Sequence, residues 1–214
     1  MDIRQVANEK KYDWASSVYD VIAYLMSLGQ AKKLYKTIAD NLKIPEMGTV
    51  VELGCGPASV VPSLLEKVGT SARIVGIDFS CEMIKIANDK KSAGNWSNVE
   101  FICMDMYQYS PEEKVDSVVF SLALTAMPEY EKAIDKALDI LKPGGQLLII
   151  DSIPLHTKWY HFFSNLYIAF KSLIVGAKPV GKILEYLEGQ TDEMKTREMV
   201  GGVYMLIDAR KKGG

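Results

Sequence analysis

Carboxylate side chains stand at or near the ends of three short apolar segments. Glu52 lies in the run 50–53, which leads into the glycine-rich turn Gly54-Cys55-Gly56. Asp78 ends a second apolar run, and Asp105 follows a third. Parallel strands end at one edge of a sheet, so we expect the three acids to lie near a turn whose glycines let a ligand approach the backbone. Carboxylates there can accept hydrogen bonds from hydroxyls and amines or face a cation.

Two ligand classes fit a strand, a Gly-x-Gly turn and an apolar helix, namely dinucleotides and S-adenosylmethionine. A dinucleotide site needs a third glycine, where this chain has Ser59. Glu52 would repel a pyrophosphate but suits the ammonium of a methionine group. Asp78 follows Gly56 at about the spacing, roughly 20 residues, at which an acid meets ribose hydroxyls. The pattern therefore favours S-adenosylmethionine, and a nicotinamide-dependent oxidoreductase is the less favoured alternative.

The third acid extends the predicted site toward an adenine ring. Asp105 can accept a hydrogen bond from the exocyclic amine, and Met106 can pack its thioether against the ring. Each acid taken alone also fits a helix N-cap or a solvated strand end. Acids at three successive strand ends are harder to explain in that way, so we predict one binding site that takes the whole cofactor.

Composition limits the class of protein. The chain has 214 residues, 48% of them hydrophobic, which is enough for one compact α/β domain. A net charge of −2 gives no electrostatic footprint for nucleic acid, so we expect a small-molecule substrate and no nucleic-acid partner. No leader pattern or membrane-spanning run is visible, so we expect a cytoplasmic protein, either a monomer or a homodimer.

Three cysteines occur, at positions 55, 81 and 103, without the paired spacing of a metal site. An odd number argues against a disulfide framework. We therefore expect three reduced thiols that fill small buried positions near the cofactor edge of the sheet, and no bound metal.

The elements that must position these residues alternate between strands and helices, which is typical of a doubly wound parallel sheet with right-handed crossovers. Helices are expected over 59–67, 81–91 and 130–141, the last one stopped by Pro143-Gly144-Gly145. Residues 194–200 and 203–207 are expected to form a hairpin. That hairpin would supply an antiparallel last strand.

Between residues 50 and 150 the chain resembles the class I S-adenosylmethionine-dependent methyltransferases. The resemblance rests on Glu-Leu-Gly-Cys-Gly at 52–56, Gly-Ile-Asp-Phe-Ser at 76–80, Asp105-Met106, the strand 115–120 with Ser121, and Leu-Lys-Pro-Gly-Gly at 141–145. It implies α/β architecture with a doubly wound, mostly parallel seven-stranded Rossmann-like sheet and an antiparallel last strand. One domain would divide into an N-terminal helical lid (1–47), a cofactor-binding core (48–151), a substrate-facing helical segment (152–193) and a terminal hairpin (194–209).

The same resemblance implies the site residues. The cofactor-binding residues would be Tyr19, Glu52, Gly54, Cys55, Gly56, Asp78, Phe79, Met83, Asp105, Met106 and Ser121. We expect the acceptor to face Leu122, Leu124 and Thr125 after the fourth strand, and Trp159 and Phe163 of the aromatic segment 158–174.

Two families of methyltransferase are similar to the rest of the chain, those of ubiquinone and menaquinone biosynthesis and the small bacterial phospholipid N-methyltransferases. Both have a Tyr-Asp pair before a helix, matched here by Tyr19-Asp20, which would place Tyr19 at the mouth of the site. The loop 121–128 lacks the Arg-Asn pair of the quinone enzymes, and its Met127-Pro128 ending resembles the phospholipid type. Gly201-Gly202-Val203 resembles the quinone type.

An aromatic stripe recurs at helical spacing between residues 158 and 174, and it contains Trp159, Phe162, Phe163, Leu166 and Phe170. Such a helix can lie peripherally at a membrane surface or roof an apolar substrate pocket. A core-facing helix or a dimer contact are the alternatives.

For catalysis, Tyr19 and His161 are the candidate residues, and no general base is identified. We predict an S-adenosylmethionine-dependent methyltransferase that acts on a small hydrophobic or lipid-like acceptor, either a quinone-like ring or an amine headgroup. The alternative from another class is a cofactor-binding regulatory subunit without catalysis.

Overall fold

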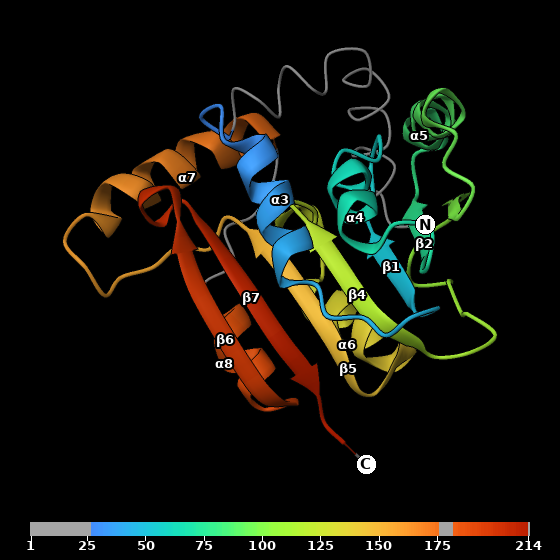
Figure 1. Ribbon diagram of the computed structural model, residues 1–214. Helices are drawn as coiled ribbons and strands as arrows, with labels where there is room; N and C mark the ends of the chain where they lie inside the picture. Colours follow the sequence, from blue (N-terminus) through green and yellow to red (C-terminus); the bar gives the residue numbers. More distant parts are fainter. Residues whose placement is uncertain (1–26, 176–181, 214) are drawn as a thin grey trace.

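The computed structural model describes residues 27–175 and 182–213, which fold around one seven-stranded sheet (Figure 1). Tyr19 lies outside the described residues. The strands follow the order β3-β2-β1-β4-β5-β7-β6. Their bounds are Thr49–Leu53 (β1), Arg73–Asp78 (β2), Val99–Cys103 (β3), Val115–Ser121 (β4), Leu141–Asp151 (β5), Thr191–Met199 (β6) and Tyr204–Lys211 (β7).

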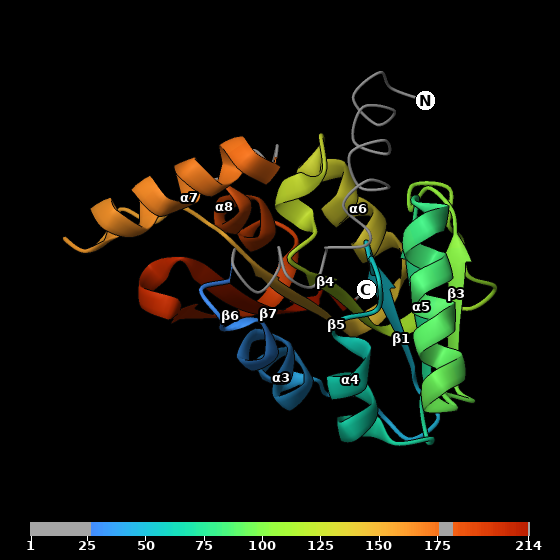
Figure 2. The same cartoon turned by 90° about the horizontal axis from the view of Figure 1, so that it is seen from above.

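Helices cover both faces of the sheet. Their bounds are Ala31–Asn41 (α3), Val61–Val68 (α4), Cys81–Gly94 (α5), Tyr130–Ile140 (α6), His161–Val175 (α7) and Ile183–Glu188 (α8), with short 3-10 turns at Leu124–Ala126 (η2) and Val200–Gly202 (η3). Figure 2 shows α3 and α4 on one side of the sheet and α6 and α8 on the other. Within the described part of the chain, no helix combines the length and the apolar content that crossing a membrane requires.

Strands β1 to β5 are parallel, and β7 runs antiparallel between β5 and β6. The predicted fold class is confirmed, including the antiparallel addition at the end of the chain. The chain moves outward in opposite directions from β1 and β4, which are neighbours. Such a switch point leaves a crevice at the carboxyl ends of the strands, where ligands of open α/β sheets bind.

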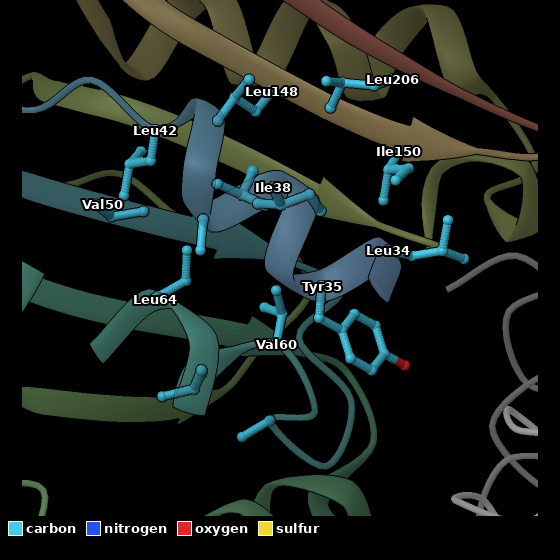
Figure 3. Close-up of a cluster of buried hydrophobic side chains, with 14 of the residues drawn as sticks. Leu34, Tyr35, Ile38, Leu42, Val50, Val60, Leu64, Leu148, Ile150 and Leu206 are labelled. Atoms are coloured by element: carbon cyan, nitrogen blue, oxygen red, sulfur yellow. The ribbon is translucent and has the colours of Figure 1, made fainter. Parts of the chain in front are cut away.

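Two apolar clusters, one on each face, hold the sheet between its helices. On the first face Leu34 and Ile38 of α3 pack with Leu64 of α4 against Val50 and Leu148, all fully buried (Figure 3). Burying each such side chain contributes about 1.5–3 kcal/mol. The described helix of the predicted N-terminal lid is therefore a layer of the core.

Helix ends differ from the prediction by a few residues. Helix α5 continues to Gly94, where Asn95 adopts a left-handed conformation with φ 51° and closes the helix. Helix α6 ends at Ile140, and β5 begins at once, with the Pro143 region forming an irregularity in its pairing with β4. The predicted hairpin is present and longer than expected, because β6 begins at Thr191 and β7 extends to Lys211.

Candidate functional site

A pocket lies at the switch point, at the carboxyl ends of β1, β2, β3 and β4. The structure brings most of the predicted cofactor residues together there. The lining residues are Gly54, Gly56, Ile77, Asp78, Phe79, Met83, Met104, Asp105, Met106, Tyr107, Leu122, Ala123, Ala126, Met127 and Pro128.

The floor of the pocket is the turn after β1, and its first glycine is required by a close approach. Gly54 has φ 74°, and a Cβ there would lie 2.8 Å from the Cβ of Ala123. Its amide and that of Cys55 donate to the carbonyl of Ile77 at 2.8 and 3.0 Å. A side chain at position 54 would therefore push the loop after β4 away from the floor of the pocket.

Asp78 ties the end of β2 to this turn. Its Oδ2 accepts a hydrogen bond from the amide of Gly56 at 2.8 Å, and its Oδ1 accepts one from the amide of Ser80 at 2.9 Å. Burial nevertheless raises the pKa of the carboxyl above its ordinary value. A ligand whose hydroxyl groups donate hydrogen bonds to Asp78 would offset this cost of burial.

Glu52 lies in β1, next to the turn, and is 2% exposed. Its Oε2 has no hydrogen-bond partner among the described residues, and Ser121 Oγ at the end of β4 is in the same situation. Burial raises the pKa of Glu52 well above its ordinary value, and the charge of Asp78 raises it further. A buried acceptor without a partner is costly, so both atoms are suited to a polar ligand that the fold itself does not supply.

The side of the pocket that is expected to face the adenine ring lies after β3. The amide of Tyr107 donates to Asp105 Oδ1 at 3.1 Å, and this turns the loop back over the pocket. Met106 is buried there, and Met83 of α5 and Met104 line the same side. Polarisable thioethers beside a carboxylate form a surface suited to an aromatic ring that carries an amine. Burial, with the charge of Asp105, raises the pKa of Tyr107 to about 12, so its hydroxyl stays protonated at neutral pH.

The loop after β4 presents only part of the predicted acceptor-facing set to the pocket. Leu122 lines it in a left-handed conformation, φ 58°, that is unusual for leucine. Leu124 is buried in the core instead. The Thr125 hydroxyl donates to Asp151 Oδ1 at 2.7 Å, so it points away from the pocket. Ala123, Ala126 and Met127 were not among the predicted site residues and face the pocket in their place.

His161 does not line this pocket. Its Nδ1 accepts a hydrogen bond from the amide of Lys158 at 3.2 Å, and its Nε2 lies 3.4 Å from Glu198 Oε2. Its ring also lies against Gly202, where a Cβ would come within 2.9 Å of it. The structure therefore places this candidate catalytic residue at the junction between α7 and the β6–β7 hairpin.

Trp159 and Phe163, predicted to face the acceptor, do not line the pocket either. Both are exposed, and so is most of the aromatic stripe of which they are part. The core-facing alternative is wrong for this stripe, because the buried side of α7 is formed by His161, Ser164 and Ile168.

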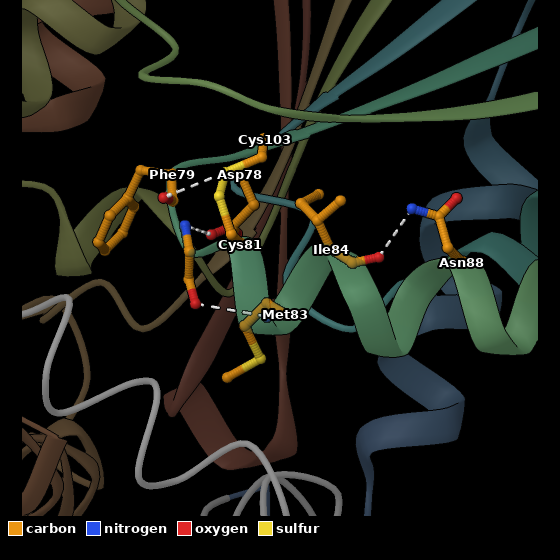
Figure 4. The surroundings of a disulfide bond; sticks show 8 residues. Asp78, Phe79, Cys81, Met83, Ile84, Asn88 and Cys103 are labelled. Carbon is orange, nitrogen blue, oxygen red and sulfur yellow. Dashed lines mark hydrogen bonds between the residues drawn. A yellow bond between two sulfur atoms is a disulfide. The ribbon is translucent and has the colours of Figure 1, made fainter.

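The expectation of three reduced thiols is wrong. Cys81 and Cys103 form a disulfide with a Cα–Cα distance of 5.2 Å (Figure 4), and Cys55 alone is a free thiol. The bond arises because Asp78 pairs in register with Cys103 across β2 and β3, while α5 begins at Cys81 just beyond Asp78. It joins two of the segments that line the pocket.

Comparison with known proteins agrees with the geometry. A family model described as a methyltransferase domain matches residues 45–191. The chain belongs to this methyltransferase family. Relatives include the demethylmenaquinone methyltransferases of Listeria monocytogenes serotype 4a, 27% identical over 78% of this chain and 71% of the relative, and of Desulfitobacterium hafniense, 23% identical over 87% and 75%. The N-methyltransferase NodS of Bradyrhizobium japonicum, solved with S-adenosyl-L-homocysteine, shares the fold with TM-score 0.62 and 17% identity over 88% of each chain.

The chain is thus an S-adenosylmethionine-dependent methyltransferase, and the pocket fits that cofactor on three observations. The glycine at position 54 lets the turn and the loop after β4 approach closely enough to form the pocket, since a Cβ there would lie 2.8 Å from Ala123 Cβ. The partnerless Oε2 of Glu52 suits the ammonium of the methionine part. The carboxylates of Asp78 and Asp105 suit the ribose hydroxyls and the adenine amine. The roles of the individual residues stay predictions.

Next to the pocket, the methyltransferase contains a buried polar network that connects the loop after β4 to α7. Asp151, at the end of β5, accepts hydrogen bonds from the Thr125 amide at 2.9 Å and the Ser152 amide at 2.7 Å. Lys171 of α7 donates to Ser152 Oγ and to the Tyr204 hydroxyl, the latter at 3.0 Å. Sequence reasoning missed this network, because its members come from four separate elements that only the folded sheet brings together.

Lys171 makes the stability of the methyltransferase depend on pH. Burial lowers the pKa of its ammonium from 10.5 to about 8, although the charge of Asp151 acts in the opposite direction. The unfolded chain therefore binds more protons than the folded one between about pH 8 and 10.5, and stability gained from this residue rises with pH in that window. Relative to Lys171→Met, we expect the wild type to gain about 2 kcal/mol in free energy of unfolding between about pH 7 and 9.5.

Urea unfolding of both proteins at the two pH values measures this difference. Burial also raises the pKa of the Cys55 thiol, which lowers stability as the pH rises past 9, but it does so equally in both proteins. Equal changes in the two proteins would contradict the prediction.

Proposed function

We propose that this methyltransferase transfers the methyl group of S-adenosylmethionine to a small hydrophobic acceptor with a quinone-like ring in its reduced, hydroxylated form. The observation that carries the proposal is the composition of the pocket wall after β4. That wall consists of Leu122, Ala123, Ala126, Met127 and Pro128.

No charged side chain belongs to this wall among the residues that the structure describes. The one hydroxyl of the short helix η2, that of Thr125, is already bonded to Asp151. The pocket acids Asp78 and Asp105 stand on the opposite side, after β2 and β3, where the cofactor is expected. A cationic amine headgroup would find no counter-charge at the wall, whereas a flat apolar ring would be desolvated by it. The names of the demethylmenaquinone methyltransferase relatives support the same acceptor class.

The cofactor supplies an electrophilic methyl group on a sulfonium. The protein's part is to align the acceptor and exclude water. Gly54 permits the loop after β4 to close against the turn, and Asp78 and Glu52 would orient the two ends of the cofactor. Leu122 and Met127 would hold the acceptor ring in line with the methyl group. The hydroxyl of a reduced quinone makes its neighbouring ring carbon nucleophilic. When that carbon takes the methyl group, the hydrogen it carried leaves as a proton to solvent, because the described wall after β4 offers no side chain that could accept it.

The test follows label from methyl-labelled S-adenosylmethionine into three substrates. They are a prenylated naphthohydroquinone kept reduced, phosphatidylethanolamine, and a soluble metabolite extract. We expect label in the first. Label only in the second or third would overturn the proposal, and tight cofactor binding without transfer to any of the three would favour the regulatory-subunit alternative.

A pair of variants shows whether transfer depends on the described pocket. Asp78→Ala is expected to lower kcat/KM about 10- to 100-fold, because the cofactor would lose a buried carboxylate that accepts hydrogen bonds from its hydroxyl groups. Asp89→Ala removes an exposed carboxylate on the nearby helix α5 and should change neither binding nor transfer. Equal activity of the two variants would show that the cofactor binds elsewhere.

A further inference from the structure

The outer side of α7 and the turn before it form the most apolar surface of the described chain. Six large apolar side chains project from it, each between 59% and 85% exposed, namely Trp159, Phe162, Phe163, Leu166, Phe170 and Leu173. We call these six residues the α7 stripe. Exposed apolar side chains scattered singly need no explanation, but a contiguous group of this kind marks a surface that binds something.

The inner side of α7 is mixed, because Ile168 packs into the core beside polar side chains, while the large aromatic residues face outward. Its inner side carries polar groups that hydrogen bond to the body of the protein, since His161 contacts Glu198 and Lys171 contacts Ser152 and Tyr204. These bonds fix which side of the helix faces outward. The aromatic side is therefore presented to the surroundings by specific contacts, and rotation of the helix would break them.

The charge around the α7 stripe is one-sided. No aspartate or glutamate occurs in the sequence between Asp151 and Glu185, whereas the whole chain has 27 acidic residues. The same stretch contains lysines, of which Lys158 and Lys182 are exposed and flank the helix. Lys158 is paired with Glu198 of β6 at 2.9 Å, so the charges of this lysine and this acid offset each other, and Lys182 is a further exposed cation of the stretch. A surface that combines exposed aromatic residues with more lysines than acids is complementary to an anionic lipid headgroup layer.

The position of the stripe connects it to the pocket. Helix α7 follows β5, whose carboxyl end contacts the pocket loop through the bonds of Asp151 to Thr125. Both views show α7 on the outside of the molecule, with its first turns extending beyond the edge of the sheet (Figures 1 and 2). Because α7 follows β5 and the pocket lies after β1 to β4, the stripe and the pocket both belong to the end of the sheet where the parallel strands terminate.

We infer that the α7 stripe docks this methyltransferase onto the surface of a bilayer that contains anionic lipid, so that a bilayer-resident acceptor enters the pocket directly. The inference deepens the proposed function, because it rests on an acceptor of the quinone-like class. Trp159 and the three phenylalanines insert at the level of the headgroups, and exposed lysines contact anionic phosphates. Docking of this kind is reversible and requires no spanning helix.

The experiment is co-sedimentation of the full chain with vesicles of phosphatidylcholine alone and of phosphatidylcholine with phosphatidylglycerol. We expect binding to the anionic vesicles that weakens with salt, together with a blue shift of tryptophan fluorescence that Trp159→Phe abolishes. The triple variant Phe162→Ser, Phe163→Ser, Phe170→Ser should lower the partition coefficient about 10- to 100-fold, since three exposed rings no longer leave water. The control is Met47→Ser, which removes a large apolar side chain, 87% exposed, from the loop before β1 at the other end of the sheet.

Two readouts separate this inference from the proposed function. With the acceptor embedded in vesicles, the triple variant should lose most of its transfer, whereas with a short-chain acceptor in solution it should match the wild type. Vesicle binding without transfer to either acceptor would overturn the proposed function and leave docking intact. A wild type that stays in the supernatant with anionic vesicles overturns the docking inference. So does a wild-type dimer that the triple variant converts to a monomer while vesicle binding is unchanged.

Discussion

Replacing Glu52 by glutamine is expected to stabilise the ligand-free protein and, at the same time, to weaken its binding of S-adenosylmethionine. The carboxylate is buried, and its Oε2 has no partner among the described residues. Removing an unsatisfied buried charge should raise the free energy of unfolding by about 1–3 kcal/mol. The same substitution removes the group that would face the cofactor's ammonium, so the dissociation constant should rise about 10- to 100-fold.

The sign of the stability change follows from the pKa of Glu52, which burial raises well above the ordinary value of 4.5. In the folded state the carboxyl keeps its proton to a higher pH than in the unfolded chain. Below pH 4.5 the carboxyl is protonated in both the folded and the unfolded chain, and its burial costs the least stability. The free energy of unfolding then falls as the pH rises from 4.5 through the raised pKa of the folded state. The advantage of Glu52→Gln should therefore be small near pH 4 and grow toward neutral pH.

Urea unfolding and calorimetric titration with S-adenosylmethionine measure the two effects on one preparation. Glu100→Gln is the matched control, because Glu100 lies in the nearby strand β3, is about half exposed and pairs with Arg73 at the surface. A surface pair of this kind contributes little, so the control should change both quantities by less than about 1 kcal/mol. Unchanged cofactor affinity in Glu52→Gln would contradict the role proposed for this residue.

The parts of the site that could be predicted from the sequence are those that one strand and the turn after it specify alone. Gly54, Asp78 and Asp105 each follow a short apolar run, and parallel pairing of the runs brings their ends together without any further information. The fold class was predictable for the same reason. Alternating strand and helix patterns leave few topologies once right-handed crossovers are required.

The parts that could not be predicted depend on contacts between elements distant in the chain. Leu124 and Thr125 follow Ser121 just as Leu122 does, but the 3-10 turn η2 directs them to the core and to Asp151. The helical spacing of the aromatic residues of α7 could be recognised from the sequence. Which side faces outward was decided instead by the bonds of His161 and Lys171 with β6, β7 and Ser152.

Reduction of the disulfide is expected to lower both the stability of the protein and its affinity for the cofactor. Cys81 and Cys103 close a loop that includes all of α5, with a sequence separation of 22. Loop closure of this length stabilises a folded chain by about 3 kcal/mol through the entropy of the unfolded state. The bond also joins the segment of Asp78 and Phe79 to that of Met104 and Asp105, both of which line the pocket. Reduction should therefore also weaken cofactor binding several-fold.

Urea unfolding and cofactor titration with and without dithiothreitol measure both effects, and the double variant Cys81→Ser, Cys103→Ser should reproduce the reduced state without reductant. Cys55→Ala is the matched control, because this cysteine is the one free thiol of the described residues, and its variant should keep the full response to dithiothreitol. Titration of thiols in the denatured, unreduced chain decides whether the bond forms at all. One reactive thiol is expected, and three would show that α5 is held against β3 by packing alone, in which case reductant should change neither quantity.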